Sequence, residues 1–299
     1  MIDQAWKLRA LTRGKDLPNA ARRASQETPK ADAAVVHVVA VTSGKGGVGK
    51  TTLAVNLAVL LADSGKRVLI VDADLGLANV DVMLRLDSSR HIGHLLLAQC
   101  TPDEIAAVGP SGVQVISGGS GLQELAEASN ADRQLLLDKL RGYYQRFDYV
   151  FIDTSPGIGA DVVDFLRDAD ELVLVTTPEP TSLRDTYAAL KTIGREAPNA
   201  DVRLVVNMAS AAQAEEAMAV LNEVASKFLN RRYDDWQCVE CDPMVGRTVR
   251  EGKPLVSAYP RSAAAICLRR LARSLGHNRP SLRGPNSTLE AAHAAAQRR

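Results

Sequence analysis

The sequence predicts an α/β fold in which helices cover both faces of a mostly parallel sheet. Short, continuous apolar runs alternate along the chain with longer helical stretches, and this alternation requires crossover connections between parallel strands. Aromatic residues make up only 4% of the 299 residues, whereas 46% are hydrophobic. A core of Ala, Val and Leu is typical of parallel strands that are buried on both faces.

The predicted elements follow one another in a regular order. A strand over 35–43 precedes a helix over 51–62 that is rich in Ala and Leu. Further apolar runs predict strands at 66–74, 149–154, 171–177 and 202–208. We expect three parts, which are a polar leader over 1–33, one domain over 34–275 and a polar tail over 276–299.

Composition and charge exclude several classes of protein. The formal charge is +1, so no global field attracts nucleic acid or membrane. No apolar stretch approaches the roughly 18 residues of a membrane span, and the start of the chain has no apolar segment typical of a signal peptide. Four cysteines are too few for a disulfide framework. We therefore expect a cytoplasmic protein.

A glycine-rich loop joins the first strand to the first helix with the spacing of a phosphate-binding loop, Gly44-x-x-x-x-Gly49-Lys50-Thr51. Glycines let backbone N–H groups curl around phosphates, and the helix N-terminus adds its positive dipole end. We expect Lys50 to neutralise β- and γ-phosphates and the Thr51 hydroxyl to ligate Mg²⁺. The predicted nucleotide contacts in this loop are Gly44, Gly46, Gly47, Val48, Gly49, Lys50, Thr51 and Thr52.

Two other strand ends supply the carboxylates that a magnesium site requires. Asp153 ends a hydrophobic run, and we expect it to hold Mg²⁺, while Gly157 in the following loop offers an N–H to the γ-phosphate. Asp72 and Asp74 lie two residues apart and therefore share a face of an extended strand. Asp74 is the candidate for orienting the attacking water, and Asp72 for supporting Mg²⁺ or its waters. Alternatively, one of the pair caps the following helix.

The loop also contains a second lysine, Lys45, which phosphate binding within one subunit does not require. A lysine there would crowd a site that Lys50 already serves. A lysine that reached across a dimer interface would instead place positive charge on the phosphates of the other subunit. The alternative is an ordinary solvated loop residue.

These motifs resemble those of the MinD/ParA family of P-loop ATPases, which carry a deviant Walker A motif. The resemblance covers roughly residues 35–275. It rests on KGGVGKTT at 45–52, DADLGLANVD at 72–81 and FIDTSPGIG at 151–159.

The family resemblance implies a P-loop NTPase sheet of the SIMIBI class that binds ATP and Mg²⁺. It implies an ATP-dependent homodimer in which Lys45 acts in trans, and a slow hydrolysis that resets the monomer. It also implies that Asn207, at the end of the run LVVN, pairs with the adenine edge. The later segment RRYDDWQCVECDPM departs from the Gly-x-x-Pro-x-Asp-like pattern of the family, so adenine contacts beyond Asn207 stay open.

The first residues, DQAWKLR at 3–9, resemble the DQAxxLR motif that begins the FlhG (FleN) family of flagellar regulators. This resemblance implies that the segment is a helix that docks on the signal-recognition-type GTPase FlhF and stimulates it, with Gln4 or Arg9 helping to set the catalytic geometry. The implied partner-binding residues are Asp3, Gln4, Ala5, Leu8 and Arg9. The alternative is an amphipathic helix that packs on its own domain.

The resemblance as a whole implies an ATP-dependent switch that controls flagellar number and placement. It extends the implied partners to a flagellar transcription regulator and components of the flagellar C-ring. A division-site ATPase like MinD, a DNA-partition ATPase like ParA and a non-enzymatic anti-activator that binds a flagellar transcription regulator are the alternatives. The near-neutral charge and the lack of an evident basic stripe argue against DNA as a partner.

A possible membrane contact rests on the segment 262–275. Its apolar residues recur at helical spacing beside three arginines, at Leu268, Leu271, Ala272 and Leu275. The pattern suits a helix on the inner face of the cell membrane, and it suits the last core helix of a domain equally well. Both interpretations stay open from the sequence.

Cys238 and Cys241 form a single C-x-x-C pair. A structural zinc site takes four ligands, and the other cysteines, Cys100 and Cys267, are distant in sequence. We expect free thiols rather than a metal site.

Overall fold

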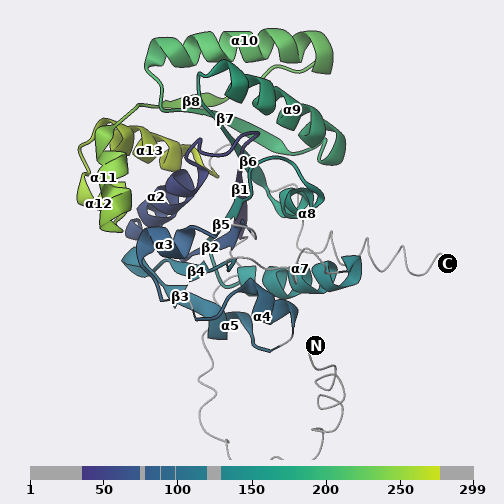
Figure 1. The fold of residues 1–299 in the computed structure, drawn as a ribbon, viewed down its shortest axis with the longest axis vertical. Helices are drawn as coiled ribbons and strands as arrows, with labels where there is room; N and C mark the ends of the chain where they lie inside the picture. Colours follow the sequence, from purple (N-terminus) through teal and green to yellow (C-terminus); the bar gives the residue numbers. More distant parts are fainter. Residues whose placement is uncertain (1–35, 75–77, 88, 98, 120–128, 277–299) are drawn as a thin grey trace, which may run out of the picture. The chain divides into compact units, whose positions relative to one another are not determined.

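The computed structural model describes residues 36–276 except 75–77, 88, 98 and 120–128 (Figure 1). The DQAWKLR segment, the rest of the expected leader and the tail beyond residue 276 lie outside the described residues. The predicted boundaries of the leader and tail therefore stay predictions.

Within the described residues, eight strands form one sheet in the order β3-β4-β2-β5-β1-β6-β7-β8. All neighbouring strands are parallel except β3 and β4, which are antiparallel. The strands are β1 (His37–Thr42), β2 (Val68–Ala73), β3 (Ala106–Val108), β4 (Gln114–Ile116), β5 (Tyr149–Thr154), β6 (Glu171–Thr176), β7 (Asp201–Asn207) and β8 (Trp236–Val239). Because β5 lies between β1 and β2, the carboxyl ends that carry the predicted site residues are neighbours.

Helices cover both faces of the sheet, and each face has its own hydrophobic cluster (Figure 1). One face carries α2 (Lys50–Asp63), α3 (Val80–Leu84), α11 (Pro243–Glu251), α12 (Leu255–Ala258) and α13 (Ala263–Ser274). The other face carries α4 (Ile92–Leu96), α5 (Pro102–Ile105), α7 (Asn130–Tyr144), α8 (Ala160–Asp168), α9 (Pro180–Glu196) and α10 (Ala211–Leu229). A short 3₁₀ turn, η1 (Pro110–Gly112), lies between β3 and β4.

Successive residues of the central strands enter opposite clusters, as the period of two along a strand requires. In β5, Val150 and Ile152 join the cluster beneath α7 and α8, whereas Phe151 joins the cluster beneath α2. All three side chains are fully buried. Each such burial contributes about 1.5–3 kcal/mol relative to exposure, so continuous apolar runs are what this sheet requires.

The predicted α/β fold with a mostly parallel sheet is confirmed, and each strand and helix predicted within the described residues is present within one or two residues of its expected ends. The sequence did not predict β3, β4 and β8. These strands have three or four residues, which is too short to show a period of two, and β8 lies at the sheet edge with half-buried residues.

The apolar stripe of α13 faces the core. Leu268, Leu271, Ala272 and Leu275 are at most 6% exposed and belong to the cluster beneath α2. This burial supports the interpretation of 262–275 as the last core helix. Among the described residues, no helix is long and apolar enough to span a membrane.

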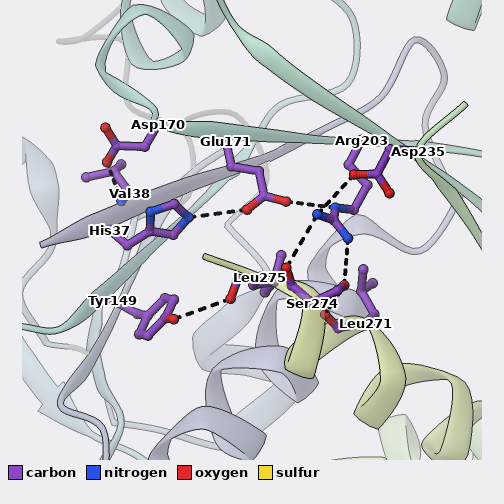
Figure 2. Close-up of polar contacts among 10 residues, drawn as sticks. All are labelled: His37, Val38, Tyr149, Asp170, Glu171, Arg203, Asp235, Leu271, Ser274 and Leu275. Carbon is purple, nitrogen blue, oxygen red and sulfur yellow. Dashed lines mark hydrogen bonds and ion pairs between the residues drawn. The ribbon is translucent and has the colours of Figure 1, made fainter. Parts of the chain in front are cut away.

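A buried ion network fixes the end of α13 to the amino-terminal edge of the sheet (Figure 2). The Arg203 guanidinium donates to Glu171 Oε1 at 2.7 Å and to Ser274 Oγ at 2.6 Å, and Nε2 of His37 lies 3.2 Å from Glu171 Oε2. Burial raises the pKa of Glu171, but the hydrogen bond with His37 and the charge of Arg203 outweigh it and lower the pKa. This edge lies opposite the phosphate loop, which follows the carboxyl end of β1.

Candidate nucleotide-binding site

The predicted phosphate loop connects β1 to α2, and its backbone requires glycine at several positions. Gly47 and Gly49 have φ of 78° and 92°, in the left-handed region that favours glycine. A Cβ at Gly49 would lie 2.4 Å from Asn207 Nδ2, and one at Gly44 would lie 2.2 Å from the carbonyl oxygen of Asp185. The loop therefore packs closely against the end of β7 and the second turn of α9, as a rigid cradle for phosphates requires.

Lys50 begins α2 and is 8% exposed. Burial lowers the pKa of its ammonium group, although the charges of Asp153 and Asp74 raise it in part. The two carboxylates are thus close enough to act on Lys50 electrostatically. An anionic ligand at the loop would add negative charge and stabilise the ammonium form further.

Asp153 ends β5 and is 1% exposed. Burial raises the pKa of its carboxyl group to about 7, although a hydrogen bond with the Thr51 side chain lowers it in part. Within the described residues, Asp153 Oδ1 is buried with no hydrogen-bond partner. A buried carboxylate oxygen that lacks a partner and lies beside a hydroxyl offers the hard oxygen ligands that Mg²⁺ prefers. The residues present therefore fit a magnesium ion.

Asp72 lies beside Asp153 in the register of β2 and β5. Its Oδ1 accepts from the Asp74 N–H at 3.1 Å, and its Oδ2 accepts from the N–H groups of Asn79 and Val80 at 2.9 and 3.0 Å. Burial raises the pKa of Asp72 to about 6 despite these hydrogen bonds. The carboxylate thus caps the start of α3, which is the alternative interpretation that the sequence left open. A metal role for Asp72 stays a prediction.

Asp74 follows β2 and is half-buried. Its Oδ1 accepts a hydrogen bond from Ser155 Oγ at 3.1 Å, which links it to the loop after Asp153. In the same loop, the Gly157 N–H donates to the Ser43 carbonyl oxygen at 2.8 Å, and Gly157 has a φ of 90°. The N–H predicted to contact the γ-phosphate is therefore bound to the phosphate loop here. The catalytic role of Asp74 and the phosphate contact of Gly157 stay predictions.

Lys45 is held by its own chain. Its Nζ lies 2.7 Å from Glu179 Oε2 and donates to Thr181 Oγ1 at 3.0 Å. Glu179 is the N-cap residue of α9, and Thr181 lies in the first turn. The sequence did not indicate these two partners, because only the adjacency of β1 and β6 brings them to the loop. A role of Lys45 in trans stays a prediction, and it requires the release of this intrachain contact.

Asn207 ends β7 and is 6% exposed. Its Nδ2 donates to the Val48 carbonyl oxygen at 2.8 Å, so the side chain braces the phosphate loop. An adenine contact of Asn207 stays a prediction. Nearby, Asp242 accepts from the N–H groups of Met244 and Ala264, which joins the starts of α11 and α13.

Other predicted residues lie apart from this site or outside the described part. The leader residues Asp3 to Arg9 are not described. Cys238 is half-buried on β8 and donates to the Ala209 carbonyl oxygen at 3.4 Å, whereas Cys241 is exposed. Among the described residues, no group of three or more His, Cys, Asp or Glu side chains is arranged to hold a metal ion.

Comparisons with known proteins identify the family of the chain. A family profile described as "ParA: NUBPL iron-transfer P-loop NTPase" matches residues 34–276. The chain is 37% identical over 241 residues to the antiactivator FleN of Pseudomonas aeruginosa, which covers 80% of this chain and 86% of FleN. It is 34% identical over 230 residues to the flagellum site-determining protein YlxH of Helicobacter pylori. This alignment covers 74% of this chain and 76% of YlxH.

Solved structures show the same fold. The cell division ATPase MinD of Pyrococcus furiosus superposes with a TM-score of 0.67 and 25% identity over 79% of this chain and 97% of MinD. MinD of Pyrococcus horikoshii, solved with Mg-ADP, superposes with a TM-score of 0.68 and 24% identity. This superposition covers 81% of this chain and 96% of that MinD. With its phosphate loop, its buried Asp153 and these matches, the chain belongs to the ParA/MinD family of P-loop ATPases.

Proposed function

We propose that this chain is a slow, Mg²⁺-dependent ATPase that dimerises with ATP and thereby regulates flagellar number and placement. The observation that carries the enzymatic part is the unpartnered, buried Asp153 Oδ1 beside Thr51 at the mouth of the phosphate loop. The flagellar part is supported by two relatives, the antiactivator FleN and the flagellum site-determining protein YlxH.

The chain's own residues have distinct roles in this proposal. The loop N–H groups and Lys50 bind and orient the phosphates of ATP, and Thr51 and Asp153 hold Mg²⁺, with Asp72 supporting its waters. When bound, Mg²⁺ neutralises charge on the phosphate oxygens. Asp74 orients the attacking water, and its hydrogen bond with Ser155 lets the 155–159 loop respond to the state of the nucleotide.

Dimerisation completes the site in this proposal. Lys45 leaves Glu179 and Thr181 and contacts the phosphates of the second subunit, where it stabilises the charge that develops during transfer. Because the contact with Glu179 is exposed, its loss is a small cost that phosphate binding can offset. Hydrolysis then returns the protein to a monomer in which Lys45 is held again.

The partners follow from the sequence motif and from the relatives. We propose that residues 3–9 stimulate an FlhF-type GTPase, and that a flagellar transcription regulator and C-ring components read the ATP-bound dimer. Binding at the inner face of the membrane also belongs to this proposal, but it does not use the buried stripe of α13. A division-site role is the second candidate, since MinD of Synechocystis is 30% identical over 247 residues.

Deletion of the gene from the source organism, followed by a count of flagella per cell, tests the proposed function. We expect an altered number or position of flagella that the wild-type gene restores. A variant with Lys50→Ala, which removes the phosphate contact, should fail to restore it at equal protein abundance. Normal flagella together with displaced division septa would instead support the division-site role.

A further inference from the structure

Two hydrogen bonds hold the segment 155–159 against neighbouring parts of the candidate site. Ser155 Oγ donates to Asp74 Oδ1 at 3.1 Å, and the Gly157 N–H donates to the Ser43 carbonyl oxygen at 2.8 Å. The segment therefore contacts both the residue that follows β2 and the start of the phosphate loop. We call this arrangement of residues 155–159 the docked loop.

The docked loop also packs on the phosphate loop, and it is anchored at both of its ends. A Cβ at Gly46 would lie 3.8 Å from Pro156 Cγ, an ordinary van der Waals contact, so Pro156 lies over Gly46. Before the loop, Thr154 is 1% exposed and its Oγ1 donates to the Val41 carbonyl oxygen at 3.2 Å. After it, Gly159 is the N-cap residue of α8. The residues between these anchors form one short segment, so their contacts break together.

The docked loop uses two groups that the proposed reaction needs elsewhere. The Gly157 N–H has a single hydrogen to donate, so it cannot contact a γ-phosphate while it donates to Ser43. Asp74 Oδ1 accepts from Ser155, whereas an attacking water requires an acceptor oxygen of Asp74. A γ-phosphate that takes the Gly157 N–H must therefore displace the loop from both contacts. ADP has no γ-phosphate and leaves them intact.

The hydroxyl of Ser155 is the part of this docking that a substitution can remove cleanly. Its acceptor is a carboxylate, and hydrogen bonds to a charged group are stronger than neutral ones. Ser155 and Asp74 are both half-buried, so water can take the place of a deleted hydroxyl at the carboxylate. Loss of the hydroxyl should therefore weaken the docked loop without leaving a buried polar atom unpaired.

We propose that Ser155 determines how strongly the protein discriminates between ATP and ADP, by stabilising the docked loop against the loop position that contacts a γ-phosphate. The proposal rests on the proposed ATPase function. Ser155 acts through Asp74 rather than by contact with the nucleotide, so it is a positioning residue. ATP binding must break its hydrogen bond, whereas ADP binding leaves the bond in place. The hydroxyl thus weakens the binding of ATP alone.

The test is fluorescence anisotropy with a labelled non-hydrolysable ATP analogue and with labelled ADP. Each titration contains Mg²⁺ and uses the full chain below the dimer dissociation constant. Ser155→Ala should bind the ATP analogue about fivefold more tightly, the factor that one partly solvated hydrogen bond contributes, and should bind ADP with unchanged affinity. Ser257→Ala is a matched control that removes an exposed hydroxyl from α12, and it should change neither dissociation constant.

Two further measurements locate the effect at the docked loop. Without nucleotide, the backbone amides of residues 155–159 should exchange hydrogen faster in Ser155→Ala than in the wild type. In an Asp74→Ala background, Ser155→Ala should have no further effect on the affinity for the ATP analogue, because both changes remove one contact. Thermal unfolding should confirm that the variants remain folded.

Three outcomes overturn the proposal. The first is unchanged or weaker binding of the ATP analogue by Ser155→Ala. The second is an equal change in affinity for the ATP analogue and ADP, which would indicate a general effect on the site. The third is an undiminished effect of Ser155→Ala in the Asp74→Ala background, which would place the contact of the hydroxyl elsewhere. A wild-type chain that binds neither nucleotide would overturn the proposed ATPase function as well, so the two failures are distinguishable.

Discussion

Replacement of Glu179 by Gln should strengthen ATP-dependent dimerisation, because Glu179 holds Lys45 within its own chain. The ion pair measures 2.7 Å, but the side chains of Lys45 and Glu179 are 36% and 63% exposed. Such a pair contributes about 0.5 kcal/mol after solvent screening. A dimer must break two of these pairs, so their removal favours the dimer by about 1 kcal/mol, or about fivefold in the dimer dissociation constant.

Sedimentation velocity with Mg²⁺ and a non-hydrolysable ATP analogue measures this constant directly. Glu215→Gln is a matched control, since Glu215 is an exposed residue of α10 without an ion pair in the described part of the chain. The effect of Glu179→Gln should vanish in a Lys45→Ala background, because both changes act on one contact. Unchanged or weaker dimerisation of Glu179→Gln, with Lys45 present, would refute the intrachain hold on Lys45.

Four further predictions concern the same switch. Lys45→Ala should retain ATP binding, measured by calorimetry, but lose partner-stimulated turnover; a loss of ATP binding would place Lys45 in the site of its own subunit. Asp74→Ala should accumulate an ATP-bound dimer in size-exclusion chromatography, and an unchanged hydrolysis rate would exclude Asp74 as the residue that orients water. Deletion of residues 1–12 should spare the ATPase and abolish stimulation of an FlhF-type GTPase, and surviving stimulation would contradict the role of the leader. Finally, burial raises the pKa of Asp153 to about 7, so the folded ligand-free protein binds a proton that the unfolded chain releases above about pH 4. The free energy of unfolding should therefore decline as the pH rises from about 4 to 7. In Asp153→Asn the unfolding temperature should depend less on pH over this range. The same pH dependence in Asp153→Asn and in the wild type would contradict the raised pKa of the buried carboxyl group.

Features that repeat along the chain or lie within one short segment were predictable from the sequence. The continuous apolar runs of β1, β2, β5, β6 and β7 identify buried parallel strands, because each must fill clusters on both faces. The phosphate loop is readable because its glycines, lysine and threonine lie within eight residues. The short edge strands were not predictable, since three or four residues at a sheet edge carry no period.

Contacts between distant segments could not be predicted, because the sheet order creates them. Lys45 meets Glu179 only because β1 and β6 are neighbours, and Asn207 meets Val48 only because β7 ends beside the loop. The sequence permitted either a metal role or a cap for Asp72. In the structure the N–H groups of Asn79 and Val80 donate to its carboxylate, a contact between residues seven and eight positions apart that no short motif reveals, and the metal role stays a prediction.

The packing of α2 restricts how a bound nucleotide can change this molecule. Asn56, 2% exposed in α2, donates to the Thr52 carbonyl oxygen and accepts from the N–H of Val256 in α12. The helix that begins at the phosphate loop is thereby bonded to α12. A buried, hydrogen-bonded contact of this kind resists gradual bending, because separating the groups would leave polar atoms unpaired. We therefore expect ATP to move Lys45 and the 155–159 loop while α2 and α12 stay fixed, so that the switch changes the surface that meets a second copy and leaves the core in place.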